Sequence, residues 1–331
     1  MPEYRVDPVS KYSVIVATDR MARPGAVATS AWPNPEPDCP FCRGKENETP
    51  EEVALYPSGA SNDDWQVRVV PNKYPALSRE LSKRDEQTSS HFTASQPARG
   101  FHEVVIECPD HLRDPEELSA NQLRLVLDAY AGRMQWMSRQ EGIRYVSVFK
   151  NYGPAAGASL PHAHSQIMGL DRIPPAISRE IQSCSEFHKQ TGNCLFCEIL
   201  QHEVADHCRI VDETDDFAVW CPYASRLPYE WWIVPKRHAA RFDQTEQSER
   251  AALSLVLRDS LIRLARLADH VPFNFYVHSA PFDTLTDEHY HWHIECLPRL
   301  ARRAGFEWGT DIHINPVSPE QAAARLRSFQ P

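Results

Sequence analysis

The chain has 331 residues, of which 42% are hydrophobic and 24% are charged, and its formal net charge is −10. This balance is typical of a folded globular protein of about two domains, and the acidity argues against a protein that neutralises many nucleic-acid phosphates. The sequence has no apolar run long enough to predict a transmembrane helix, and its first residues lack the apolar core of a signal peptide. We therefore expect a cytoplasmic protein with neither a membrane nor a nucleic acid as a partner.

Two short cysteine motifs with the same spacing divide the sequence. They are Cys39-Pro-Phe-Cys42 and Cys194-Leu-Phe-Cys197. One C-x-x-C arises by chance fairly often, but two copies with Phe before the second Cys favour metal binding over a redox pair or coincidence. The remaining cysteines have no such spacing and are expected to be small buried residues.

The segment after the first motif predicts two strands, a helix and two further strands. The first strands cover residues 65–77 and 101–111, and the polar stretch between them reads as a loop. Asp114 is the expected N-cap of the helix, and Pro115 its first residue. Apolar residues of the helix recur at a spacing of 3.6 as Leu123, Val126, Leu127, Tyr130, Met134 and Met137. A strand over 145–153, a glycine-rich turn and a strand over 162–170 complete the unit.

The segment after the second motif repeats this order of elements. Strands over 215–225 and 229–238 precede a helix that carries Leu253, Val256, Leu257, Leu261 and Leu264 on one face. Strands at 274–282 and 291–300 follow. His111 and His162 are 51 residues apart, and His238 and His291 are 53 residues apart. This predicts a duplicated α+β unit with antiparallel sheets and packed helices. We expect a catalytic domain over 1–180 and a second domain over 181–331, closed by a short helix with Ser318 as N-cap.

In each unit two cysteines, a histidine at the end of a strand and an H-x-H pair are able to converge. Zinc in a closed structural site takes four nitrogen or sulfur ligands. The first expected set is Cys39, Cys42, His111 and His162, and the second is Cys194, Cys197, His238 and His291. A lone histidine at a strand end is more often a surface residue, so the prediction depends on the matched positions in the repeat.

The stretch from Asn151 to Gln166 is the segment best suited to chemistry. Its small residues let the backbone approach a ligand, and its N–H groups can form an anion nest. His162, His164 and Gln166 alternate along a strand and therefore point the same way. A neutral imidazole beside such a nest can attack phosphorus, and Gln166 can donate to a phosphoryl oxygen. The alternative is a purely structural H-x-H, which the preceding glycines disfavour.

The run NYGPAAGASLPHAHSQI at 151–167 resembles the active-site motif of the galactose-1-phosphate uridylyltransferases, within the histidine-triad superfamily. The resemblance covers nearly the whole chain, through DRMARP, CPFC, PNKYP, CPDH, HSAPF, HWH and GFE. The related ADP-glucose phosphorylases of the plant type share the second C-x-x-C and a terminal GFE-x-GT-x-x-INP run, and this chain also carries that run. The resemblance implies a duplicated histidine-triad-like fold, a homodimer and nucleotidyl transfer by a ping-pong mechanism.

The same resemblance assigns expected roles to individual residues. His164 matches the nucleophile, Gln166 matches the residue that steadies the phosphoryl group, and His162 matches a zinc ligand. Related hydrolases carry a third histidine at the position of Gln166, so Gln fits transfer to a sugar phosphate. Expected substrate-binding residues are Arg20, Arg23, Asn72, Asn151, Gly157, Ser159 and Glu307. Of these, Glu307 matches a hexose-contacting position that is often contributed across a dimer interface.

Three activities follow from these expectations. The first is a UDP-glucose:hexose-1-phosphate uridylyltransferase, whose substrates are a nucleotide sugar and a hexose 1-phosphate such as galactose 1-phosphate. The second is adenylyl transfer of the ADP-glucose phosphorylase type. The third is a zinc-stabilised binding module without catalysis.

The sequence departs from the family pattern at two places. The common H-P-H is here His162-Ala163-His164, which leaves both imidazoles in place. The second metal site has two interpretations, because His278, His291, His293 and Glu180 match the iron site of other uridylyltransferases. His291 belongs to both sets, so both sites cannot be filled as described, and the cysteine pair favours zinc, with about two zinc ions per chain.

Overall fold

The structure is a computed structural model that describes residues 2–18, 38–61, 63–78, 97–112, 114–284 and 286–331. Arg20, Arg23 and most of the expected loop between the first two strands lie outside the described residues. Within the described ranges, the strands form one sheet of three and one sheet of ten. In this part of the chain no helix is both long enough and apolar enough to cross a membrane.

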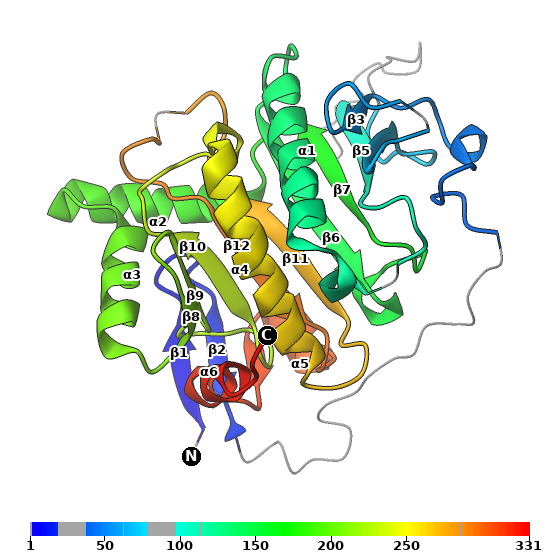
Figure 1. The fold of residues 1–331 in the computed structure, drawn as a ribbon. Coiled ribbons are helices and arrows are strands. Elements are labelled where there is room, and N and C mark those ends of the chain that lie inside the picture. Colours follow the sequence, from blue (N-terminus) through cyan, green and yellow to red (C-terminus); the bar gives the residue numbers. More distant parts are fainter. Residues whose placement is uncertain (1, 19–37, 62, 79–96, 113, 285) are drawn as a thin grey trace.

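A ten-stranded antiparallel sheet runs through the molecule (Figure 1). The first unit contributes β3 (Ala54–Tyr56), β4 (Val67–Pro71), β5 (Gly100–Ile106), β6 (Tyr145–Tyr152) and β7 (His164–Leu170). The second unit contributes β8 (Ile210–Glu213), β9 (Phe217–Trp220), β10 (Trp231–Pro235), β11 (Phe273–His278) and β12 (His293–Pro298). The order is β3-β4-β5-β7-β6-β11-β12-β10-β9-β8. Read outward from the junction of β6 and β11, both units follow the same order, which confirms the duplicated α+β unit.

Residues that pair side by side across six neighbouring strands show that the two units also match in strand register. The row reads Val104, Gln166, Phe149, Tyr276, Glu295 and Trp232. Its two central residues pair with each other across the junction of β6 and β11. Glu295 therefore occupies in the second unit the place that Gln166 occupies in the first. Two residues earlier on the same strands, His293 corresponds to His164.

Helices α1 (Ala120–Ser138) and α4 (Gln247–Ala265) lie side by side on one face of the sheet (Figure 1). All the apolar residues predicted for the inner faces of these two helices are buried, and all except Leu123, which packs with Cys108 and Leu118, belong to one core. The predicted helix start is wrong, however. Pro115 begins only a short 3-10 turn, Pro115–Glu117, and the extended backbone of Leu118 interrupts it. Ser119 is the true cap of α1, because its hydroxyl accepts from the backbone N–H of Gln122 at 3.1 Å.

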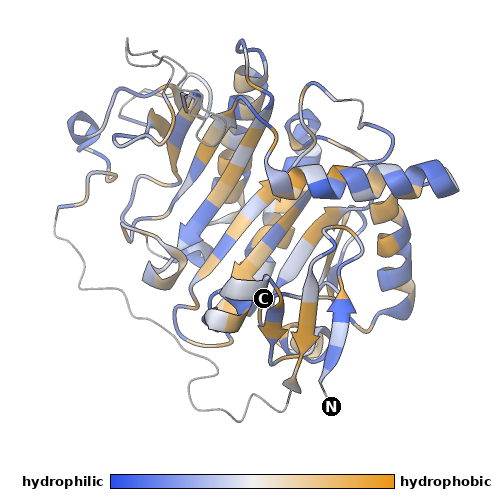
Figure 2. Cartoon of the chain, turned by 180° about the vertical axis from the view of Figure 1, so that it is seen from behind, coloured by the Kyte–Doolittle hydropathy of each residue, from blue (hydrophilic) through white to orange (hydrophobic). Residues whose placement is uncertain are grey.

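The other face of the sheet is covered unevenly. Helix α3 (Leu195–Asp206) packs its apolar residues against β9 and β10, and α2 (Pro175–Thr191) adjoins it. The small sheet is built from β1 (Glu3–Val6), β2 (Ser13–Val16) and β13 (His313–Asn315), and α5 (Gly305–Thr310) and α6 (Pro319–Arg327) complete the chain. The expected closing helix is α6, with Ser318 as its N-cap. Seen from behind, no helix of the described chain crosses the centre of this face (Figure 2).

Candidate functional site

A cavity of 660 Å³ opens on this second face beside the start of β7. His164 and Gln166 project into it from alternate positions of the strand, and Asn72 and Ser159 also line it. The volume is in the range of small-molecule sites. The structure thus brings together four of the residues that the sequence predicted for catalysis and substrate binding. Phe41, between the two cysteines of the first motif, forms part of the wall.

The imidazole of His164 is held in one tautomer. Its Nδ1 lies 2.7 Å from the backbone carbonyl oxygen of His162. Because a carbonyl oxygen can only accept, Nδ1 carries the proton and the lone pair is on Nε2. Burial lowers the pKa of His164 below its ordinary value, and the nearby charge of Lys150 also lowers it, against the hydrogen bond to His162 that raises it. The ring is therefore disposed to be a neutral nucleophile.

A buried ion pair that the sequence did not predict lies beneath His164. Lys150 Nζ donates to Glu107 Oε2 at 2.6 Å and to the backbone carbonyl of His164 at 3.1 Å. Both charged side chains are 2% exposed. Tyr130 adds a hydrogen bond from its hydroxyl to Ser165 Oγ at 2.7 Å. These contacts fix the backbone that carries the nucleophile, and the sequence signal for them was Lys150 within a predicted strand.

Gln166 is oriented by His102 of β5, a residue that the sequence did not predict for the site. The backbone N–H of Ala76 donates to His102 Nδ1 at 3.1 Å, so the neutral ring carries its proton on Nε2. That Nε2 lies 2.7 Å from Gln166 Oε1 and donates to it. The amide NH₂ of Gln166 is then left as a donor for a ligand in the cavity.

The glycine-rich turn requires glycine at its two ends. Gly153 and Gly157 have φ of 84° and 88°, a region that other residues rarely adopt. A Cβ atom at Gly153 would also lie 2.8 Å from the Cβ of Pro272. Asn151, which precedes the turn, lines a second cavity of 460 Å³ on the same face, together with Phe149. Because Phe149 pairs with Gln166, the two cavities lie on neighbouring strands.

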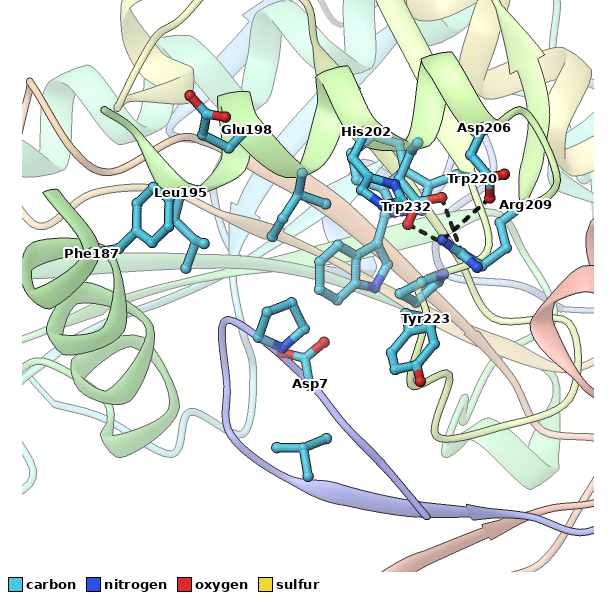
Figure 3. A pocket seen from close by; sticks show the side chains of 15 residues that line it. Asp7, Phe187, Leu195, Glu198, His202, Asp206, Arg209, Trp220, Tyr223 and Trp232 are labelled. Atoms are coloured by element: carbon cyan, nitrogen blue, oxygen red, sulfur yellow. Dashed lines mark hydrogen bonds and ion pairs between the residues drawn. The ribbon is translucent and has the colours of Figure 1, made fainter. Parts of the chain in front are cut away.

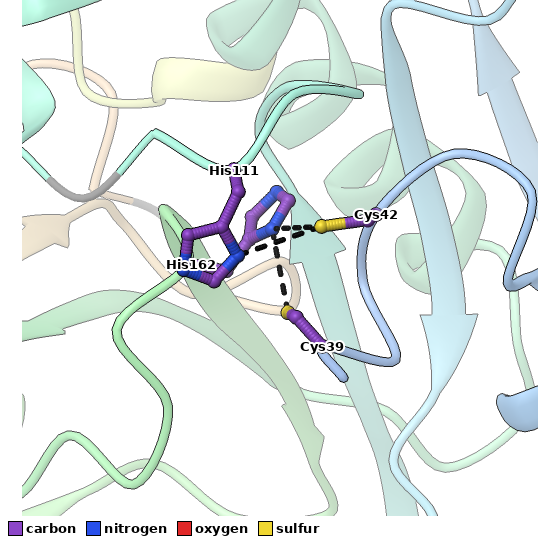
Figure 4. Close-up of side chains that lie close together, drawn as sticks. All are labelled: Cys39, Cys42, His111 and His162. Atoms are coloured by element: carbon purple, nitrogen blue, oxygen red, sulfur yellow. Dashed lines mark hydrogen bonds between the residues drawn. The ribbon is translucent and has the colours of Figure 1, made fainter. Parts of the chain in front are cut away.

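The four predicted ligands of the first metal site converge (Figure 4). Cys39 Sγ lies 3.5 Å from His162 Nδ1, and Cys42 Sγ lies 3.5 Å from His111 Nδ1 and 3.7 Å from His162 Nδ1. A tetrahedral zinc ion with ordinary bond lengths places sulfur and nitrogen ligands about 3.6 Å apart. The backbone carbonyl of Cys108 accepts from His162 Nε2 at 2.9 Å, which directs Nδ1 toward the metal position. Burial lowers the pKa of His162 to about 4, so its ring is neutral.

The second cysteine pair has the same geometry. Cys197 Sγ lies 3.4 Å from His238 Nδ1 and 3.6 Å from His291 Nδ1, and Cys194 completes the set. His291 Nε2 lies 2.9 Å from the carbonyl oxygen of Pro235, in the same arrangement as His162. The expectation that His111 and His238 end strands is wrong, because β5 ends at Ile106 and β10 ends at Pro235 and both histidines lie in the following loops.

A third cluster corrects the expected competition for His291. Glu180, His278, His293 and Glu295 have ligand atoms within 4.8 Å of one another, and His291 is not among them. Glu295 stands where the alternative iron set had placed His291, so the two sites do not exclude each other. His293 Nε2 and Glu295 Oε1 are buried 3.5 Å from each other, and neither has a hydrogen-bond partner among the described residues, which fits a metal ion. Arg226, however, forms an ion pair with Glu295.

The second unit has no open counterpart of the nucleophile cavity in its described part. The Trp232 ring stacks on His293, the counterpart of His164, with centroids 5.2 Å apart, and Phe196 covers it at 4.6 Å. His293 is fully buried. A separate cavity of 720 Å³ lies above the two tryptophans, Trp220 and Trp232 (Figure 3). Acidic side chains outnumber the one arginine, Arg209, in its lining, which disfavours a phosphate.

Two predicted substrate-binding residues of the described chain, Gly157 and Glu307, line neither of the two cavities on this face. Glu307 is 7% exposed, and its carboxylate accepts from the backbone N–H of Ala304 at 2.9 Å and of Ile314 at 3.2 Å. It lines neither the 660 Å³ nor the 460 Å³ cavity. Arg20 and Arg23, the other two, lie outside the described residues.

Comparison with known proteins assigns this arrangement to a class. Residues 1–174 match the model of the galactose-1-phosphate uridyl transferase N-terminal domain, and residues 112–329 match a domain of unknown function, DUF4921. The chain belongs to the galactose-1-phosphate uridylyltransferase family, and it is a nucleotidyltransferase.

Individual relatives are similar over almost their whole length. The ADP-glucose phosphorylase of Arabidopsis thaliana is 34% identical over 98% of this chain and 92% of that protein. The galactose-1-phosphate uridylyltransferase of Thermotoga maritima is 29% identical over 100% of this chain and 99% of that protein. The crystal structure of the Arabidopsis enzyme with bound ADP-glucose superimposes with a TM-score of 0.86 at 32% identity, covering 100% of both chains. A solved uridylyltransferase gives 0.77 at 28% identity, over 99% of this chain and 98% of that one.

Proposed function

We propose that this protein transfers a nucleoside monophosphate from a nucleotide sugar to a phosphate-bearing acceptor through a covalent nucleotidyl-histidine. The observation that carries the proposal is the free Nε2 of His164, which points from a buried, neutral ring into a cavity beside the glycine-rich turn. Gln166 supports the same chemistry, because its oriented NH₂ is available to a phosphoryl oxygen. A zinc-stabilised binding module would need neither of these features.

The two half-reactions use the same histidine. In the first, His164 Nε2 attacks the α-phosphorus, an N–P bond forms, and the P–O bond to the hexose 1-phosphate breaks. In the second, a phosphate oxygen of the acceptor attacks the same phosphorus, and the N–P bond breaks to restore the neutral imidazole. Gln166 and the backbone N–H groups near Ser159 donate to the non-bridging oxygens as charge develops. Asn72 and Phe41 line the same cavity, and we place the nucleoside against them.

Two donors fit this mechanism. UDP-glucose, with galactose 1-phosphate as acceptor, is the donor expected from the catalytic motif and agrees with the family. ADP-glucose, with inorganic phosphate as acceptor, is favoured by the similarity to the Arabidopsis enzyme and by the assembled Cys194, Cys197, His238 and His291 set. The terminal GFE and INP segments support the same alternative.

The metal content and the assembly are parts of the same proposal. Zinc fits both sets of two cysteines and two histidines by donor type and spacing, and it would stabilise the fold around the nucleophile without taking part in a bond change. The cluster that includes Glu180 and Glu295 is the alternative iron-type site. A homodimer belongs to the proposal through the family resemblance, in which the position of Glu307 contacts the hexose across a dimer interface. The division into domains 1–180 and 181–331, the roles of Arg20 and Arg23, and a cytoplasmic location stay predictions.

Isotope exchange tests the proposed function and selects the donor. Labelled glucose 1-phosphate is incubated with the protein and unlabelled UDP-glucose or ADP-glucose, without any acceptor. A ping-pong enzyme returns label to the nucleotide sugar, because the first half-reaction is reversible on its own. Label in only one nucleotide sugar identifies the base. Absence of exchange with both, at protein concentrations near that of the substrate, would contradict nucleotidyl transfer from either sugar.

A further inference from the structure

Asn274 of β11 connects the second unit to the catalytic turn of the first by hydrogen bonds. Asn274 is 9% exposed. Its amide nitrogen donates to Asn151 Oδ1 at 2.7 Å and to the backbone carbonyl of Ala156 at 2.8 Å. Its amide oxygen accepts from Arg299 Nε at 2.5 Å. Since β11 pairs with β6 at the junction of the two units, these bonds join the second unit to both ends of the segment 151–156.

The polarity of this chain of hydrogen bonds is determined at both ends. An arginine Nε–H can only donate, so the Asn274 atom facing Arg299 is the oxygen. A backbone carbonyl can only accept, so the Asn274 atom facing Ala156 is the nitrogen. A flipped Asn274 amide would lose both bonds and leave buried polar atoms without partners. The same nitrogen faces Asn151, and Asn151 must therefore present its own oxygen to Asn274.

This arrangement dictates which end of the Asn151 amide is offered to a ligand. With its oxygen bound to Asn274, the NH₂ of Asn151 is directed to the other side, 4.0 Å from the position that a Cβ of Gly157 would occupy. Two N–H donors therefore face the glycine-rich turn on the face that carries His164. Donors of this kind complement phosphoryl or hydroxyl oxygens and repel ligand N–H groups.

We propose that Arg299 and Asn274 are positioning residues, which act through Asn151 on the oxygens of the bound nucleotide sugar. The inference rests on the proposed function and deepens it, because it states that this part of the site presents N–H donors and therefore binds acceptor oxygens of the substrate. It also gives the second unit a role in the reaction, although His293, its counterpart of His164, is covered by aromatic rings. The contact between Gly153 and Pro272 supports the turn from the same side.

The test is the single-turnover rate at which His164 is labelled by a nucleotide sugar, measured together with the midpoint of thermal unfolding. Asn274→Ala removes both donors and is expected to slow labelling by about 10- to 100-fold. Asn274→Asp is expected to slow labelling at least as much. Its carboxylate accepts from the NH₂ of Asn151, so that the amide oxygen of Asn151 turns toward the substrate. Arg299→Met is expected to slow labelling, and Arg299→Lys, which keeps a donor, to restore most of the rate.

Gln135→Ala is the matched control, since the Gln135 amide also bridges the two units, by donating to the carbonyl of Asp243 at 2.6 Å on the helical face. Its labelling rate is expected to stay within about twofold of wild type, at a comparable loss in unfolding midpoint. If Asn274→Ala lowers only the midpoint, or if Arg299→Lys is no better than Arg299→Met, the inference is overturned and the proposed function stands. If the wild-type protein takes no label, the proposed function itself fails, and the inference fails with it.

Discussion

Lys150 donates to Glu107 at 2.6 Å, and the pair lies directly beneath the carbonyl of His164, shielded from water on both sides. A buried charge that loses its partner destabilises a fold far more than a surface charge does. The nucleophile thus rests on an ion pair between Lys150 of β6 and Glu107, the residue that follows β5.

Replacing Lys150 with methionine should lower the free energy of unfolding by about 3–5 kcal/mol, because Glu107 is left buried and uncompensated. Urea denaturation measures this loss. The double variant Lys150→Met with Glu107→Gln removes both charges and should recover a large part of it. If the double variant is as unstable as the single one, the loss reflects packing of the lysine stem, and the ion-pair explanation is wrong.

Neutral His164 should remain the reactive form below the ordinary histidine pKa of 6.5, because burial and Lys150 both lower its pKa. Protonation removes the lone pair, so a lowered pKa keeps the ring active to more acid pH. The rate of the first half-reaction is therefore expected to stay flat as the pH falls from neutral to 6.5 and to decline only at more acid pH. Stopped-flow or quenched-flow measurements at a series of pH values give this profile. A midpoint above 6.5 would contradict the assigned environment.

Elemental analysis should find two zinc ions per chain. Cys39→Ser and Cys194→Ser should each remove one ion and lower the unfolding midpoint, since metal binding contributes directly to folding. Glu180→Gln serves as the matched control and should leave the zinc content at two. A third equivalent of metal that Glu180→Gln abolishes would show that the alternative iron-type cluster is filled.

His102→Leu should slow transfer by about tenfold or more, with little change in nucleotide affinity, because Gln166 loses the donor that orients its amide. The comparison is between the single-turnover rate and the dissociation constant of the nucleoside monophosphate. His102→Gln, which keeps a donor for Gln166, should recover part of the rate. Equal rates for wild type and His102→Leu would show that Gln166 needs no support from β5.

The parts of the site that depend on local spacing could be predicted from the sequence. The spacing between the cysteines and histidines predicted both four-residue sets, and alternation along one strand predicted that His164 and Gln166 share a face. The helix start was missed because Asp114 and Ser119 are both acceptable caps, and only the extended backbone at Leu118 decides between them.

Contacts across the sheet could not be read from the sequence, because they depend on strand register. His102 meets Gln166 across β5 and β7, at a separation of 64 residues, and Asn274 meets Asn151 at a separation of 123 residues. Likewise His291 was shared between two candidate metal sites in the sequence, and only the geometry assigns it to the cysteine pair. Contacts between side chains so far apart in the sequence can be identified only from the three-dimensional structure.

The most direct measurement is the position of the covalent label. The protein is incubated with UDP-glucose or ADP-glucose labelled on the α-phosphate, quenched in alkali to preserve a phosphoramidate, digested and mapped by mass spectrometry. The account predicts a nucleoside monophosphate on His164 from one of the two donors. The label should be absent in His164→Ala and retained in His293→Asn, its symmetric counterpart in the second unit. A label on any other residue, or none from either donor, would contradict the account.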